Sequence, residues 1–173
     1  RKELFKGLAI EKLETEWTKY PVIHLDLSRG KYYSVENLHG VLNMVLGICE
    51  EPYHIVPANL RDYSARLNTI IRTAVKQTGQ KAVILIDEYD APMLDSITDE
   101  NLRKQIRNIM RDFFSPLKAN EGIERFVFLT GITKFSQLSI FSELNNITNI
   151  SMKDDYAAIC GITEQEMLDN FQE

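Results

Sequence analysis

The sequence predicts an α/β domain of three layers, in which helices cover both faces of a mainly parallel sheet. Apolar runs typical of strands alternate with helical apolar stripes from residue 21 onward. The run from Ala82 to Ile86 is apolar at every position, which is typical of a strand buried on both faces. No repeat, low-complexity tract or linker interrupts the pattern, so we expect residues 1–173 to form a single domain.

The first half of the chain contributes one strand and two long helices to this prediction. Residues 3–13 are expected to form one or two helical turns, and residues 21–28 alternate after a proline as a strand does. Residues 34–50 begin with a serine that can cap a helix, and they carry one apolar stripe. Residues 59–78 carry a second stripe, and Gly79 is placed to end that helix.

The second half continues the alternation after the apolar strand. Acidic residues at positions 99 and 100 suit the positive end of the helix that follows them. The expected elements are a helix over 99–118, a strand over 123–131, a short irregular helix over 136–145, a short strand over 146–151, and a last helix opened by a capping box of Thr163 and Glu166.

Composition excludes some classes of function and leaves others open. A net charge of −5 argues against a broad nucleic-acid-binding face, although a local basic groove stays open. Cys49 and Cys160 are expected to be buried free thiols, and His24, His39 and His54 show no ligand spacing, so we expect neither a zinc nor a redox cofactor. No apolar run could span a membrane and no signal peptide is visible, so we expect a cytoplasmic protein.

Acidic residues follow the apolar strand directly. In open α/β sheets ligands bind beyond the carboxyl ends of the strands, and Asp87, Glu88 and Asp90 fall at such an end. Nucleotide hydrolysis needs one carboxylate there to hold magnesium and a second to orient or deprotonate the attacking water. The pattern also occurs where a strand simply exits to solvent, and the residues alone favour neither interpretation.

The next strand end supplies further candidates. Thr130 could sense a γ-phosphate or hydrogen-bond its own turn, and Lys134 could neutralise phosphate charge or stand in solvent. Arg103, Arg107 and Arg111 form a basic stripe at four-residue spacing on the expected helix. A solvated face is the commoner role of such a stripe, and a subunit contact or an anionic ligand is the alternative.

A phosphate-binding loop would read G-x-x-x-x-G-K-[ST] between a strand and a helix, and the chain contains no such run. Gly30 and Lys31 stand between the first strand and its helix, but Tyr32 occupies the position of the magnesium-binding hydroxyl. The position of the first glycine is held by Leu25. We therefore expect an ordinary strand-to-helix turn there.

Three segments together carry a resemblance to a known family: "AVILIDEYDAP", "FVFLTGITKFSQLSIFSELNNITNIS" and "YAAICGITEQEM". They resemble the predicted AAA-ATPase-like family, whose members look like P-loop NTPases and often carry a C-terminal nuclease-like domain of the PD-(D/E)XK superfamily. The resemblance extends from about Lys2 to the end. It implies ATP and magnesium as cofactors, with Asp87 and Glu88 as the Walker B acids, Asp87 on the metal, and Thr130 as a sensor.

In that family the phosphate loop precedes the segment that residues 3–13 resemble. The resemblance therefore implies a three-layer P-loop NTPase-like domain whose first strand and phosphate loop are missing from this chain. Two functions stay open: an ATP-hydrolysing core that is inactive alone, and a non-catalytic α/β scaffold linked to a nuclease-like domain. Whether the chain is an enzyme is left open with them, and its expected partners are that nuclease-like domain or further copies of the chain.

Overall fold

A computed structural model describes residues 2–132, 147–159 and 162–171. Its centre is a parallel sheet in the order β1-β2-β3, built from β1 (Val22–Asp26), β2 (Ala82–Asp87) and β3 (Glu124–Leu129). β1 and β3 fall inside the ranges predicted from the sequence, and β2 extends the predicted apolar run by one residue, Asp87. The α/β class and the parallel sheet are thereby confirmed.

Three long helices form the second layer: α2 (Val35–Glu50), α3 (Tyr63–Thr78) and α5 (Glu100–Ala119). Each begins at a side chain that accepts a hydrogen bond from the backbone amide three residues later. These caps are Ser34 for α2, Asp62 for α3 and Asp99 for α5. Gly79 closes α3 in the left-handed conformation, as the sequence predicts.

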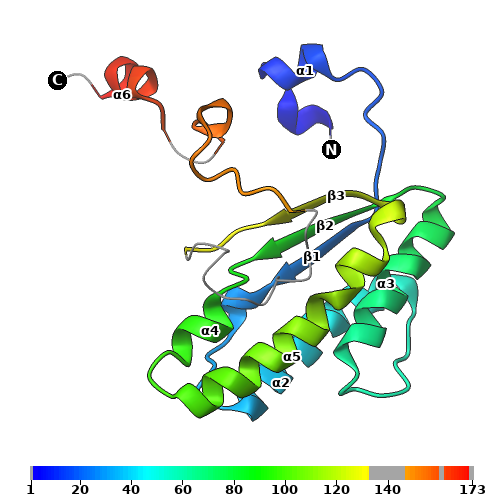
Figure 1. The fold of residues 1–173 in the computed structure, drawn as a ribbon. Helices are drawn as coiled ribbons and strands as arrows, with labels where there is room; N and C mark the ends of the chain where they lie inside the picture. The colour runs from blue at the N-terminus through cyan, green and yellow to red at the C-terminus, as the bar shows by residue number, and fades with distance from the viewer. Residues whose placement is uncertain (1, 133–146, 160–161, 172–173) are drawn as a thin grey trace.

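The helices lie on one face of the sheet, so the described residues form two layers rather than the predicted three (Figure 1). The two crossovers, from β1 to β2 and from β2 to β3, both step in the same direction across the sheet. Because such crossovers are right-handed, steps in one direction place their helices on one face. The uninterrupted apolar run of β2 led to the expectation of a layer on each face.

The burial pattern of the strands follows from this one-sided cover. Ile23 and Leu25 of β1 and Ile84 of β2 point to the helices and are almost completely buried. Val22 and Phe126, on the opposite face, are 54% and 53% exposed. The core therefore lies between the sheet and α2, α3 and α5, and an apolar face of the sheet stays uncovered by the described residues.

Smaller elements complete the description. A short helix that the sequence did not predict, α4 (Ala91–Asp95), follows β2. The expected turns near the N-terminus are η1 (Lys2–Phe5) and α1 (Ala9–Leu13), and the capping box opens α6 (Glu164–Asn170). The remaining short elements are the 3-10 turns η2 (Leu27–Arg29), η3 (Glu51–Tyr53), η4 (Glu121–Ile123) and η6 (Asp154–Tyr156).

One predicted strand is wrong where the structure describes it. Residues 147–151 are irregular, because the side chain of Asn149 accepts a hydrogen bond from the amide of Ser151 and Ile150 accepts one from Lys153, which turns the backbone. The helix expected over 136–145 lies outside the described residues. No helix in the described ranges is both long and apolar enough to cross a membrane.

Candidate functional site

The predicted acids and threonine meet at the carboxyl end of the sheet. Asp87 is the last residue of β2, and Thr130 directly follows β3. The amide of Thr130 donates to the carbonyl of Ile86, and the amide of Tyr89 donates to the carbonyl of Thr130, at 2.9 and 3.0 Å. These two backbone bonds hold the ends of the strands in register, although the residues are more than forty positions apart in the chain.

A single hydroxyl links both predicted Walker B positions. The Thr130 hydroxyl donates a hydrogen bond to Oδ1 of Asp87. It also accepts one from the backbone amide of Glu88, at 3.4 Å. All three residues are partly exposed, so the carboxylates remain within reach of a ligand at the sheet edge.

The backbone makes a sharp turn at Glu88. This residue has a φ of +51°, which places it in the left-handed region that side chains other than glycine rarely occupy. Its carbonyl accepts from the amide of Ala91 at 3.0 Å, and the carbonyl of Asp90 accepts from Met93 and Leu94 as α4 begins. Strained conformations of this kind concentrate at functional sites, where the surrounding structure maintains them.

The two residues that follow Glu88 are closely packed. Tyr89 is 4% exposed and Asp90 is fully buried. Burial, followed by the charge of Asp90, raises the pKa of Tyr89 to about 12. A Cβ atom on Gly131 would stand 2.5 Å from Oδ1 of Asp90, so only glycine fits at this position without a shift of its neighbours. Gly131 is a site residue that the sequence analysis did not single out.

Asp26 is a second residue that sequence reasoning missed. It is the last residue of β1 and stands beside Asp87 in the register of the sheet. Its carboxylate accepts hydrogen bonds from Ser28 and then from Arg29, which hold its pKa below the usual range. The carboxylate therefore caps the turn after β1. The sequence signal that could have identified Asp26 is an acidic residue at the end of the first predicted strand.

The other candidates fall outside this group. Lys134 lies outside the described residues. Arg103 and Arg107 are partly buried on α5, and the Nε atom of each has no hydrogen-bond partner, while Arg111 is exposed. Cys49 is a buried free thiol, as predicted, and burial raises its pKa to about 11.

The turn that contains Gly30 is not a phosphate cradle. A Cβ atom at Gly30 would stand 2.2 Å from Cγ2 of Val41, so the glycine lets the turn pack against α2. Tyr32 is fully buried, and its hydroxyl donates to the carbonyl of Leu27. The prediction of an ordinary strand-to-helix turn is confirmed.

Comparison with protein families places the chain in one of them. The model of the AAA-ATPase-like family, described as predicted AAA-ATPases, matches residues 1–141. An uncharacterized protein in the vnfD 5′ region of Azotobacter chroococcum mcd 1 is 34% identical over 165 residues, which are 95% of this chain and 32% of that protein. The chain thus spans about a third of the length of that relative. No solved structure matches the chain.

Proposed function

Because the chain belongs to the AAA-ATPase-like family, we propose that it forms the magnesium- and water-handling part of an ATP-hydrolysing site. Asp87 holds the metal, Glu88 orients and deprotonates the attacking water, and Thr130 senses the γ-phosphate. The observation that carries the proposal is the Thr130 hydroxyl, which binds Asp87 and the amide of Glu88 at once. A ligand that moves this hydroxyl would therefore change a hydrogen bond of Asp87 and a hydrogen bond of Glu88 together.

The residues present suit magnesium. The donors at the sheet edge are carboxylate and hydroxyl oxygens, which are the ligands that this metal prefers. The described residues contain no cluster of three or more His, Cys, Asp or Glu side chains able to hold a metal ion. Magnesium needs no such cluster, since it keeps several waters and takes one or two carboxylates together with substrate phosphates. When bound, it would neutralise charge that develops on the phosphate oxygens.

The proposal needs a phosphate-binding loop that these 173 residues do not contain. We assign that loop to another segment of the natural protein. The outer edge of β3 has no partner strand within the described ranges, and the uncovered face carries the exposed Phe126 beside it. A strand and helix that bring a phosphate loop would find an unpaired edge and an apolar face there.

The test is ATP hydrolysis by the natural full-length protein that contains this chain, with substitutions at the site. Replacing Glu88 by Gln removes the proposed base, so hydrolysis should fall by about 10²–10⁴-fold while ATP binding changes little. Thr130→Val should also slow hydrolysis, and Thr130→Ser, which keeps the hydroxyl, should restore most of it. Asp112→Asn is the matched control, because Asp112 is an exposed acid on α5.

Two results would overturn the proposal. Hydrolysis that survives Glu88→Gln unchanged would remove the role of Glu88. A full-length protein that binds no ATP would favour the alternative, in which this domain is a non-catalytic scaffold. Asp87 and Glu88 would then only stabilise the turn after β2.

A further inference from the structure

The outer edge of β1 presents backbone groups that no described strand pairs with. β1 pairs with β2 on one side, and no described strand lies on its other side. The carbonyl of Pro21 accepts from the amide of Val83 at 2.9 Å, so it points toward β2. Since backbone groups alternate along a strand, those of Val22, His24 and Asp26 point away from β2. The carbonyl of His24 indeed faces α2, where the thiol of Cys49 donates to it at 3.4 Å.

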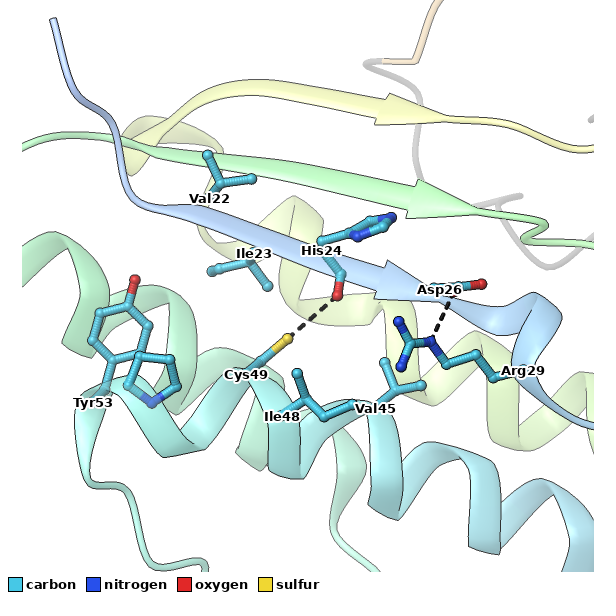
Figure 2. Close-up of a pocket in the computed structure, with 10 residues that line it drawn as sticks. Val22, Ile23, His24, Asp26, Arg29, Val45, Ile48, Cys49 and Tyr53 are labelled. Carbon is cyan, nitrogen blue, oxygen red and sulfur yellow. Dashed lines mark hydrogen bonds and ion pairs between the residues drawn. The ribbon is translucent and has the colours of Figure 1, made fainter. Parts of the chain in front are cut away.

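A cavity of about 320 Å³ lies along this edge, between β1 and the C-terminal half of α2 (Figure 2). Val45, Ile48 and Cys49 line its helical side. Tyr53 stands at one end and the side chain of Arg29 at the other. One wall of the cavity is thus a row of polar backbone groups, and the opposite wall is apolar.

The charges around the cavity set the chemistry of its occupant. α2 carries no Asp, Glu, Lys or Arg from Asn37 to Cys49. Met44 and Ile48 on this helix are nevertheless 41% and 48% exposed. The two charged residues of the cavity, Asp26 and Arg29, neutralise each other in an ion pair of 2.8 Å. An uncharged apolar segment complements this surface, whereas a charged one would lose hydration without gaining a partner.

We propose that an extended segment of a partner protein, uncharged and with apolar residues at alternate positions, adds to β1 as a fourth strand. Its main chain would bond to the outward groups of Val22, His24 and Asp26, and an apolar side chain would enter the cavity against Val45 and Ile48. Strand addition of this kind draws affinity from the backbone and specificity from pockets for alternate side chains. The five residues of β1 match a peptide of about five residues, or about 16 Å. Of these contacts, Asp26 is the one beside the proposed ATP site, since it stands next to Asp87 in the register of the sheet.

The test starts with a phage-displayed library of random uncharged hexapeptides, selected on this chain and then synthesised. His24→Pro removes an outward amide that β2 does not use, and an edge strand tolerates proline there. His24→Ala is its matched control, because it keeps the amide. Ile48→Asp puts a charge on the apolar wall, and Ile97→Asp puts one on a side chain that is 59% exposed but does not line the cavity.

We expect selected peptides to protect the amides of Val22, His24 and Asp26 from hydrogen exchange. Affinity should fall about tenfold in His24→Pro and Ile48→Asp, as expected for a lost hydrogen bond or a buried charge, and stay within about twofold in both controls. Circular dichroism must show that each variant is folded. The proposal would be overturned by a library that yields no binder. It would also be overturned by peptides that bind His24→Pro and Ile48→Asp as tightly as the wild type. Self-association that His24→Pro abolishes would likewise overturn it, since a second copy would then occupy the edge.

Discussion

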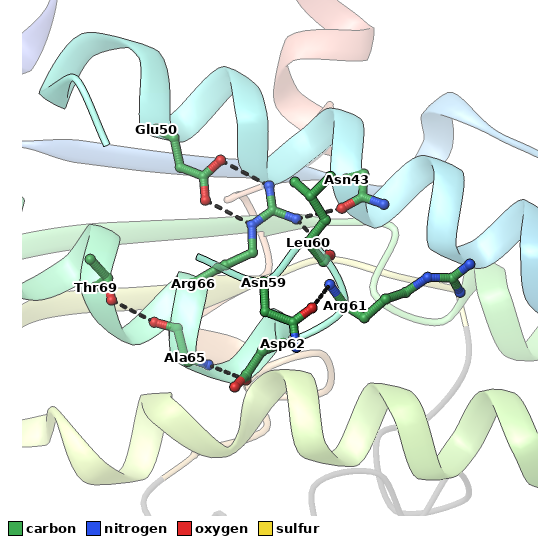
Figure 3. Close-up of polar contacts among 9 residues, drawn as sticks. All are labelled: Asn43, Glu50, Asn59, Leu60, Arg61, Asp62, Ala65, Arg66 and Thr69. Atoms are coloured by element: carbon green, nitrogen blue, oxygen red, sulfur yellow. Dashed lines mark hydrogen bonds and ion pairs between the residues drawn. The ribbon is translucent and has the colours of Figure 1, made fainter. Parts of the chain in front are cut away.

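A buried ion pair joins α2 to α3, and it allows a stability prediction with a definite magnitude. Arg66 of α3 donates from Nε and one terminal nitrogen to the two carboxylate oxygens of Glu50, both at 2.8 Å (Figure 3). Its other terminal nitrogen donates to the side chain of Asn43 and to the carbonyl of Leu60. The side chains of the pair are only 4% and 5% exposed, so each charge depends on the other for compensation.

Arg66→Met should lower the free energy of unfolding by about 3–5 kcal/mol, because it leaves the Glu50 carboxylate buried without its cation. The double variant Arg66→Met, Glu50→Leu should lose clearly less than this, since it removes both charges from the interior.

Urea unfolding of the single and double variants at pH 7 measures these effects. The matched control is the ion pair of Arg61 and Glu36, which has a similar distance of 2.9 Å but is 51% and 76% exposed. The same substitutions there should change stability by less than about 1 kcal/mol. If Arg66→Met fails to fold, the double variant should still fold. The single variant Glu50→Leu completes the comparison. If the loss of stability in the double variant equals the sum of the losses in Arg66→Met and Glu50→Leu, this account of the pair is refuted.

Two further predictions concern the packing and the titration of the sheet region. Gly131→Ala should destabilise the chain by about 1–3 kcal/mol, because the new methyl group would stand 2.5 Å from Oδ1 of Asp90, whereas Gly122→Ala, with open space around it, should be tolerated. Burial, and then the charge of Glu121, raises the pKa of Glu124 from 4.5 to about 7. Stability should thus fall as pH rises through this interval, because the folded state retains a proton that the unfolded state has released. Glu124→Gln should remove that slope in urea unfolding at a series of pH values, and an unchanged slope would contradict the assignment.

Local patterns were enough to predict most of the fold. The apolar runs of the three strands and the stripes of α2 and α5 depend on residues close in sequence, and so does the capping box of Thr163 and Glu166. The helix expected from residue 59 begins at Tyr63 instead. Side chains decide this boundary, because Asn59 binds the amide of Arg61 and Asp62 binds that of Ala65.

The features that the sequence missed depend on the neighbours of each strand. The one-sided cover of the sheet follows from the direction of two crossovers, which periodicity does not encode. The bond between Thr130 and Asp87 needs the register of β2 with β3. The left-handed turn at Glu88 and the close approach of Gly131 are likewise set by packing. The acids could be predicted as candidates from sequence, but their connection through one hydroxyl could not.

Calorimetry of ATP binding with and without magnesium, on the natural full-length protein and its Asp87→Asn variant, tests whether Asp87 holds the metal. We expect magnesium to strengthen ATP binding in the wild type and Asp87→Asn to reduce this gain by about 10–100-fold, while metal-free ATP binding stays the same. An equal gain from magnesium in both proteins would contradict the assignment of Asp87 to the metal.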